Sequence, residues 1–184
     1  MSSANPISVL NGALQLHQIE GGFKTSIDAV LLAAACPAQG GDHILDLGCG
    51  VGSAGLCVLA RTSDTRLTGL DIQSDHIDAA HQNAGLNNIS ERSVFKCIDI
   101  RSHEGSGFDH IICNPPYEDA GAHLVSPNSK NATARGHLDK DITLEDWVKC
   151  AFDSVKSGGS FTIIHKAAKT QAIIRALGKS FGAT

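Results

Sequence analysis

The chain has 184 residues, of which 42% are hydrophobic and 18% are charged, and its formal net charge is −4. This length suits one domain with a hydrophobic core, and the negative charge argues against a generic nucleic-acid coat. No apolar run approaches the ~18 residues of a membrane span, and the N-terminus lacks the pattern of a secretion signal, so we expect a cytoplasmic protein.

Apolar strand patterns alternate with helical patterns along the chain, which predicts an α/β, doubly wound, mostly parallel sheet with helices on both faces. The strands are expected at residues 43–47, 66–71, 93–98 and 108–113, and residues 157–166 are expected to form a turn and the fifth strand. Helices are expected at residues 25–35, 51–61, 143–156 and 169–179. A further helix is expected to follow residue 74, and Ser74 can cap it. Thr143 and Asp146 resemble a capping box for the helix over residues 143–156. A longer polar loop is expected over residues 118–141.

The cysteines and histidines are scattered rather than clustered. None of the six cysteines forms a CxxC pair, and the nine histidines lack metal-ligand spacing. We therefore expect reduced thiols and no metal site.

A glycine-rich loop, "LDLGCGVGSAG", follows the first of these strands and opens a helix. Glycines there allow close backbone approach to a ligand, and a helix N-terminus favours anions. Gly50, Gly52 and Gly55 fit the dinucleotide pattern GxGxxG. Asp46 and Gly48, together with Gly50 and Gly52, fit DxGxGxG, the usual loop of S-adenosylmethionine (SAM) methyltransferases.

Three aspartates accompany this loop. Asp71 ends the second strand at a distance that suits a ribose diol in either motif. Asp46 could accept a hydrogen bond from an ammonium group, which SAM carries and NAD lacks, or it could orient the loop. Asp99 could accept from an adenine amino group, or it could be a solvated loop residue.

The stretch "NPPY" ends the fourth strand, where two prolines stop the ladder and stiffen the backbone. The side-chain oxygen of Asn114 and the carbonyl of Pro115 can hold a planar, weakly nucleophilic nitrogen as it becomes tetrahedral. Tyr117 can stack on the planar group. This pattern favours transfer of a methyl group to an amino or amide nitrogen.

The motifs "DLGCGVG", "GLDI", "CIDI" and "NPPY", in this order, resemble the class I SAM-dependent methyltransferases that modify amino nitrogens, over residues 12–180. The resemblance implies a Rossmann-like fold and SAM as cofactor. It implies catalytic roles for Asn114, Pro115 and Tyr117, and substrate contacts for Pro116 and Tyr117. The implied cofactor residues here are Asp46, Gly48, Gly50, Gly52, Asp71, Ile72, Asp99, Ile100 and Asn114.

The segment "NGALQLHQIEGGFKTSIDAVLLAAACP" is similar to the start of the bacterial methyltransferases that act on the adenine N6 of tRNA1(Val). Those proteins begin with a short strand pair and a helix. The resemblance implies that Lys24, Ser26 and Asp28 lie over the methionine end of SAM. It divides a single domain, 1–184, into an N-terminal segment of about residues 1–40 and a Rossmann-like core over 41–180.

The same resemblance implies an RNA substrate, which basic residues would contact. "NATARGHLDKD" resembles a family stretch that contains Arg135, and Lys130 and Lys140 are further candidates. Residues 149–184 carry +5, and the remainder of the chain carries −9; this basic region is either a solvated face or an RNA surface. The family sheet has seven strands, so we expect this chain, which stops after its last helix, to lack the final two.

Other functions remain open from the sequence. The chain could be a glutamine-N5 methyltransferase of peptide-release factors, whose substrate nitrogen is likewise planar and weakly nucleophilic. It could also be a guanine-N2 methyltransferase of ribosomal RNA, which methylates a nitrogen of the same kind. A nucleotide-binding module without catalysis and a dinucleotide oxidoreductase also fit the glycine loop.

Overall fold

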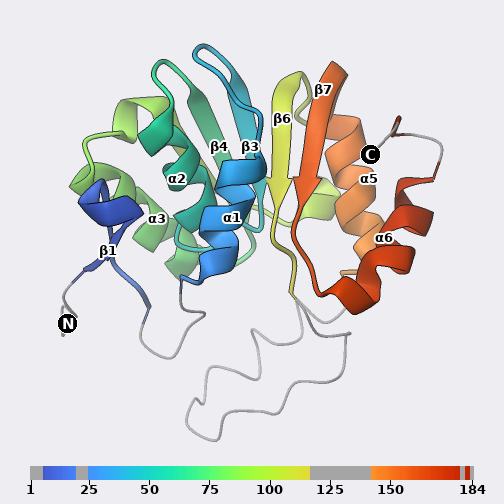
Figure 1. The fold of residues 1–184 in the computed structure, drawn as a ribbon, viewed down its shortest axis with the longest axis horizontal. Helices are drawn as coiled ribbons and strands as arrows, with labels where there is room; N and C mark the ends of the chain where they lie inside the picture. Colours follow the sequence, from blue (N-terminus) through green and yellow to red (C-terminus); the bar gives the residue numbers. More distant parts are fainter. Residues whose placement is uncertain (1–5, 20–24, 117–141, 179–180, 183–184) are drawn as a thin grey trace, which may run out of the picture.

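The computed structural model describes residues 6–19, 25–116, 142–178 and 181–182 (Figure 1). Within these residues, five parallel strands form the main sheet in the order β5-β4-β3-β6-β7. Their bounds are β3 His43–Leu47, β4 Arg66–Asp71, β5 Ser93–Cys97, β6 Phe108–Cys113 and β7 Val155–Ile163. No described strand pairs with the outer edge of β7.

Helices cover both faces of the sheet, as the alternating pattern predicts. One face packs on α1 (Ile27–Ala35), α2 (Ser53–Arg61) and α3 (Ser74–Leu86), with Ile44 and Ile112 of the sheet in that core. The other face packs on α5 (Leu144–Ser154), with Leu45, Leu47 and Ile111 in a second core. The last helix, α6 (Thr170–Leu177), lies beside α5 (Figure 1).

A small antiparallel pair precedes the main sheet, as the family resemblance implies. It consists of β1 (Ile7–Val9) and β2 (Leu14–Leu16), joined by the 3-10 turn η1 (Leu10–Gly12). Asn83 of α3 is fully buried and holds this pair in place. Its Oδ1 accepts from the His17 N–H at 2.7 Å, and its Nδ2 donates to the carbonyls of His17 at 3.1 Å and Val51 at 2.9 Å. The same amide therefore ties the N-terminal strands to the loop after β3.

The structure corrects several predicted boundaries. The first helix begins at Ile27, and the second at Ser53. Ser74 is the first residue of α3 rather than its cap, which is Gln73 without a side-chain bond. The capping box of Thr143 and Asp146 is confirmed.

The C-terminal helices and strand differ from their predicted ranges because of the way β7 pairs with β6. α5 ends at Ser154 and β7 begins at once, because the pairing with β6 shifts register between Phe108 and His110 and takes in residues 156–159 as an irregular bulge. β7 ends at Ile163. A 3-10 turn, η5 (Ala167–Lys169), then leads into α6, which begins at Thr170 and ends at Leu177. Two further short 3-10 turns, η2 (Ser90–Arg92) and η3 (Ile100–Ser102), flank β5.

The glycines of two helices offer a matched pair of stability tests. A Cβ on Gly55 of α2 would lie 2.6 Å from Leu67 Cδ2 and 3.0 Å from Asp46 Oδ2, whereas one on Gly85 of α3 would meet only Ser90 Oγ at 3.8 Å. We expect Gly55→Ala to lower the free energy of unfolding by about 1–3 kcal/mol through overpacking. Gly85→Ala should raise it by about 0.5–1 kcal/mol through helix propensity. Urea unfolding measures both, and equal effects would contradict the close packing at Gly55.

No helix in the described ranges is long and apolar enough to cross a membrane. All six cysteines are unpaired, and only Cys97 is exposed.

Candidate active site

The candidate site lies at the carboxyl edge of the sheet, where the strand order reverses. From β3 the chain builds β4 and β5 on one side, and β6 and β7 lie on the other. The glycine loop follows β3, and Asn114 follows β6, its neighbour across the reversal. Ligands of open α/β sheets bind in the crevice at such a switch point.

The glycine loop has a backbone that other residues would strain. Gly48, Gly50 and Gly52 have φ values of +69°, +54° and +85°, and Gly52 is the N-cap of α2. A Cβ on Gly48 would lie 2.9 Å from the ring of Trp147, which belongs to α5. The predicted glycines are therefore required by conformation, and at Gly48 by packing as well.

Asp46 is buried beneath this loop, with a 2% exposed fraction. Its Oδ2 accepts a hydrogen bond from the N–H of Gly55 at 3.0 Å. Burial raises the pKa of its carboxyl from 3.8 to about 7, against the lowering effect of the Gly55 bond. Of the two roles considered from the sequence, this contact supports orientation of the loop.

This buried carboxyl predicts a pH-dependent stability. Because the folded pKa is raised, the folded protein keeps a proton that the unfolded chain loses above pH ~4, so stability falls as pH rises from ~4 to ~7 and then levels. The full difference corresponds to roughly 4 kcal/mol at most. Asp46→Asn should lack this decline, measured by urea unfolding of both proteins at pH 5 and pH 8. If the stability of both proteins changed equally between pH 5 and pH 8, Asp46 would be ionised in the folded protein over this whole range.

Asp71, at the end of β4, connects the glycine loop to the next strand. Its Oδ2 accepts from the Gly50 N–H at 2.9 Å, and its Oδ1 accepts from the Gln73 N–H at 2.9 Å. His76 Nδ1 lies 3.5 Å from the same Oδ2. The carboxylate is thus held at the crevice beside Ile72, and each oxygen retains a lone pair for a hydroxyl group.

Asp99 is neither a plain solvated residue nor an open acceptor. It caps η3, where its Oδ1 accepts from the Arg101 N–H at 2.9 Å. The Arg101 guanidinium also contacts both oxygens, at 2.5 to 3.1 Å, and lowers the pKa of the carboxyl. An adenine amino group would have to share these oxygens with Arg101. Ile100 is buried in the core beneath α5.

The Asn-Pro corner leaves the sheet directly after Cys113. Asn114 is half-buried, Pro115 is buried and Pro116 is exposed. None of the hydrogen bonds between described residues uses the Asn114 amide. Directly after the neighbouring strand β7, the N–H of Ile164 donates to the carbonyl of Cys113 at 3.1 Å, which fixes the start of the corner.

The N-terminal segment reaches the glycine loop through a contact that the sequence did not predict. Thr25 Oγ1 lies 2.6 Å from Ser53 Oγ, at the first residue of α2. Ser26 then caps α1, and its hydroxyl donates to Asp28 Oδ2 at 3.2 Å. The hydroxyl pair thus fixes the chain directly before Ser26 and Asp28. No spacing rule joins residues 28 apart, so only the fold reveals it.

Several predicted site residues lie outside the described ranges: Lys24, Tyr117, Lys130, Arg135 and Lys140. Their roles stay predictions.

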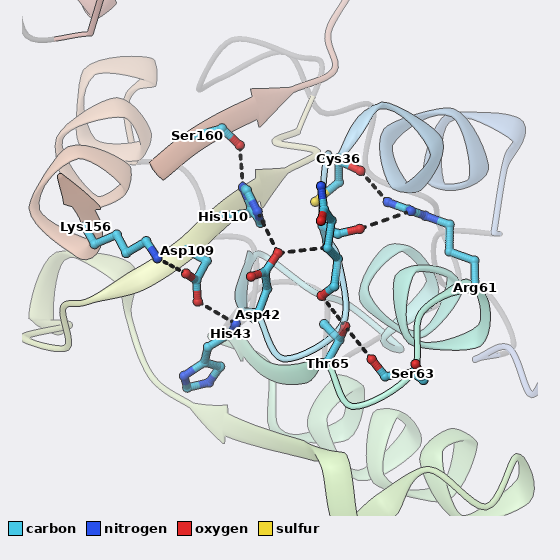
Figure 2. Close-up of polar contacts among 12 residues, drawn as sticks. Cys36, Asp42, His43, Arg61, Ser63, Thr65, Asp109, His110, Lys156 and Ser160 are labelled. Carbon is cyan, nitrogen blue, oxygen red and sulfur yellow. Dashed lines mark hydrogen bonds and ion pairs between the residues drawn. The ribbon is translucent and has the colours of Figure 1, made fainter. Parts of the chain in front are cut away.

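A second polar cluster lies at the opposite, amino edge of the sheet (Figure 2). His110 bridges Asp42 Oδ2 at 3.1 Å and Ser160 Oγ at 2.8 Å, so it joins the start of β3 to β7. Asp109 accepts from the His43 N–H at 2.7 Å and pairs with Lys156. A hollow of about 400 Å³ lies here, and another of about 440 Å³ lies between β7 and α6. We interpret the cluster as a structural one that holds neighbouring strands together, remote from the glycine loop.

Among the described residues, no group of three or more His, Cys, Asp or Glu side chains is placed to hold a metal ion.

Comparison with known proteins agrees with this geometry. Residues 23–184 match the family described as Methyltransferase small domain. The tRNA1(Val) (adenine(37)-N6)-methyltransferase of Vibrio campbellii is 37% identical over 125 residues, 67% of this chain and 51% of that protein. The protein of the same name from Escherichia coli O157:H7 is 29% identical over 146 residues, 77% of this chain and 58% of that protein. The chain thus spans about half the length of these relatives.

Among solved structures, a predicted O-methyltransferase from Agrobacterium tumefaciens superposes with a TM-score of 0.62 at 25% identity. The match covers 82% of this chain and 67% of that one.

Proposed function

The chain belongs to the methyltransferase small-domain family, and on that basis we propose that it transfers a methyl group from SAM to the exocyclic N6 of an adenine in tRNA. The names of its relatives at 30–37% identity support the adenine and the tRNA. The observation that carries the proposal is the position of Asn114 and Pro115, which follow β6 beside the glycine loop at the switch point.

The cofactor would be held by residues that the fold brings to this edge. Left-handed glycines let the backbone of the loop after β3 approach a ligand closely, the side chains of Cys49 and Val51 between them are buried, and α2 begins directly behind the loop. Asp71 would accept from the ribose hydroxyls. Ser26 and Asp28, fixed by the Thr25–Ser53 hydroxyl pair, would lie towards the methionine end. When bound, SAM supplies a methyl group on a sulfonium, which is already a strong electrophile.

The protein then needs to position and desolvate the attacking nitrogen. The N6 lone pair is delocalised into the adenine ring and becomes available as the nitrogen turns tetrahedral. The Asn114 side-chain oxygen and the Pro115 carbonyl would accept its two hydrogens in that geometry. Pro116 keeps Pro115 extended, so both acceptors are set before the substrate arrives. Tyr117 would stack on the base.

We further propose that residues 1–40 and 41–180 act as one methyltransferase domain in the cytoplasm. The bonds of Asn83 to both His17 and Val51 support this, because they join the N-terminal segment to the cofactor loop.

Incubation of unmodified tRNA with the protein and SAM, followed by mass spectrometry of the nucleosides, tests the proposal. We expect N6-methyladenosine. Methylation of a release-factor glutamine and not of tRNA would instead support the glutamine-N5 alternative, and N2-methylguanosine in ribosomal RNA would support the third.

The hydroxyl pair between Thr25 and Ser53 gives a prediction for cofactor binding. Thr25→Val keeps the shape but removes the hydroxyl, so one hydrogen bond worth ~0.5–1.5 kcal/mol is lost. We expect SAM affinity to fall roughly 2- to 10-fold in isothermal titration calorimetry. Thr25→Ser, which retains the hydroxyl, should bind as the unaltered protein does. Unchanged affinity in Thr25→Val would mean that this contact does not position the segment.

A further inference from the structure

The indole ring of Trp147 packs against the backbone of the glycine loop at a position where no side chain fits. A Cβ added to Gly48 would lie 2.9 Å from Cη2 and 3.2 Å from Cζ3 of this ring. Trp147 is buried, with an exposed fraction of 8%, and it belongs to the core between the sheet and α5. The ring and the loop are therefore in close contact inside the protein.

The end of β3 is held from both faces of the sheet. Successive strand residues point to opposite faces, so Leu47 lies in the core with α5 while Asp46 points towards α2. On the α2 side, Asp46 Oδ2 accepts from the Gly55 N–H at 3.0 Å. On the α5 side, the support comes from the Trp147 ring at Gly48, the first residue after β3, where φ is +69°.

The position of the ring follows from the way α5 begins. Because β7 starts at the amino edge of the sheet directly after α5, the helix runs from the carboxyl edge to the amino edge (Figure 1). Its first turn is fixed by the capping box, in which Thr143 Oγ1 accepts from the Asp146 N–H at 3.2 Å. The N–H of Trp147 donates to the Thr143 carbonyl at 3.3 Å. The ring therefore extends from the first turn, at the edge where the candidate site lies.

A second segment of the candidate site rests on the same helix. α5 contacts the turn η3, and Ile100 of that turn is buried in the same core as Trp147. Asp99 is the cap of η3. The glycine loop and the Asp99 turn, which follow different strands, are thus both supported by α5.

We propose that Trp147 is a positioning residue for the cofactor, whose ring keeps the backbone at Gly48 in the conformation that accepts SAM. This inference rests on the SAM binding of the proposed function and is independent of which nitrogen is methylated. A loop that loses its support on one face would be in the competent conformation for only a fraction of the time, and the apparent affinity for a ligand falls by that fraction. Once SAM is bound, the role of the ring is complete, so turnover should not depend on it.

Two substitutions test this role in SAM binding. Trp147→Phe keeps an aromatic ring in the core but is too short to reach Gly48 as Cη2 and Cζ3 do, and Trp147→Leu removes the ring. We expect the Kd for SAM in isothermal titration calorimetry to rise about 3-fold and about 10-fold, as for competent fractions of about a third and about a tenth. The KM for SAM should rise in parallel, with kcat at saturating SAM unchanged.

Phe108→Leu is the matched control for Trp147→Leu. Phe108 is buried in the same core, but it begins β6 at the opposite, amino edge of the sheet. Its replacement should lower the stability in urea unfolding and leave the Kd for SAM unchanged. A general loss of packing in this core is thereby separated from a loss of support at the loop.

A double-mutant cycle tests the contact without cofactor. Gly48→Ala strains a backbone at φ +69° and also meets the ring, whereas Gly50→Ala strains a backbone at φ +54° with no atom within 4 Å of its Cβ. In urea unfolding, Gly48→Ala should therefore cost less stability in the Trp147→Leu background than in the unaltered protein. Gly50→Ala should cost the same in both.

The outcomes separate this inference from the proposed function. If the unaltered protein binds SAM and Trp147→Leu binds it as tightly, or if Phe108→Leu weakens binding as much, the positioning role is wrong and the proposed function stands. An equal cost of Gly48→Ala in both backgrounds would also overturn the role. SAM binding that depends on Trp147, without methylation of tRNA, would support the role and overturn the assigned substrate. If the unaltered protein does not bind SAM, both are overturned.

Discussion

Replacement of Asn114 by Ala is expected to reduce turnover by roughly 100-fold or more while SAM affinity stays nearly the same. The expected size follows from the loss of one preorganised polar contact in the transition state. The structure gives a reason for the separation of the two effects. The glycine loop is held by Asp46, Asp71 and Asn83, and none of their hydrogen bonds passes through Asn114. Single-turnover kinetics and calorimetry on the same preparation measure both quantities.

Asn114→Asp is the matched control for this substitution. It keeps a side-chain oxygen at the same position, so it should retain far more activity than the alanine variant. If Asn114→Ala lost only cofactor affinity and kept its turnover, the assignment of Asn114 to the reacting nitrogen would be wrong.

Replacement of Asp71 by Ala should have the opposite profile, with SAM affinity reduced roughly 10- to 100-fold. Hydrogen bonds to a charged acceptor contribute ~1.5–3 kcal/mol, and the ribose hydroxyls would lose theirs. The variant also leaves the N–H groups of Gly50 and Gln73 without their acceptor. The loop would therefore be loosened even in the absence of cofactor.

Asp71→Asn separates these two contributions. Its remaining oxygen can serve one of the two backbone N–H groups, so the loop should be disturbed less than in the alanine variant. Calorimetry should then give an affinity between those of the unaltered protein and Asp71→Ala. Wild-type affinity in Asp71→Ala would remove this carboxylate from the cofactor site.

The strands of the inner sheet could be predicted from the sequence residue by residue. β3, β4 and β6 match the predicted ranges 43–47, 66–71 and 108–113, because each contains a buried stretch with apolar residues and is bounded by clear turn or charge signals. β7 could not be predicted in this way. Its start depends on the bulge opposite β6, with Gly158 at φ +77°, and pairing with a distant strand leaves no local signal.

In the candidate site, too, features with a local sequence signal could be predicted, and contacts that depend on the fold could not. The glycine pattern located the loop, and Asp71 and Asn114 were placed at one edge because parallel strands end together. The contacts of these residues with a cofactor and a substrate stay predictions. The sequence did not predict the contact of Thr25 with Ser53 or the ion pair of Asp99 with Arg101. The first joins segments far apart in the chain, and the second depends on the turn that η3 makes.

The buried amide of Asn83 has a consequence for the order in which the protein assembles. Its partners at His17 are 66 residues away along the chain. As the protein emerges from the ribosome, β1 and β2 leave it before α3, so the bonds to Asn83 can form only after α3 has been made. The strand pair is therefore synthesised before the helix that holds it, and it completes its native contacts late.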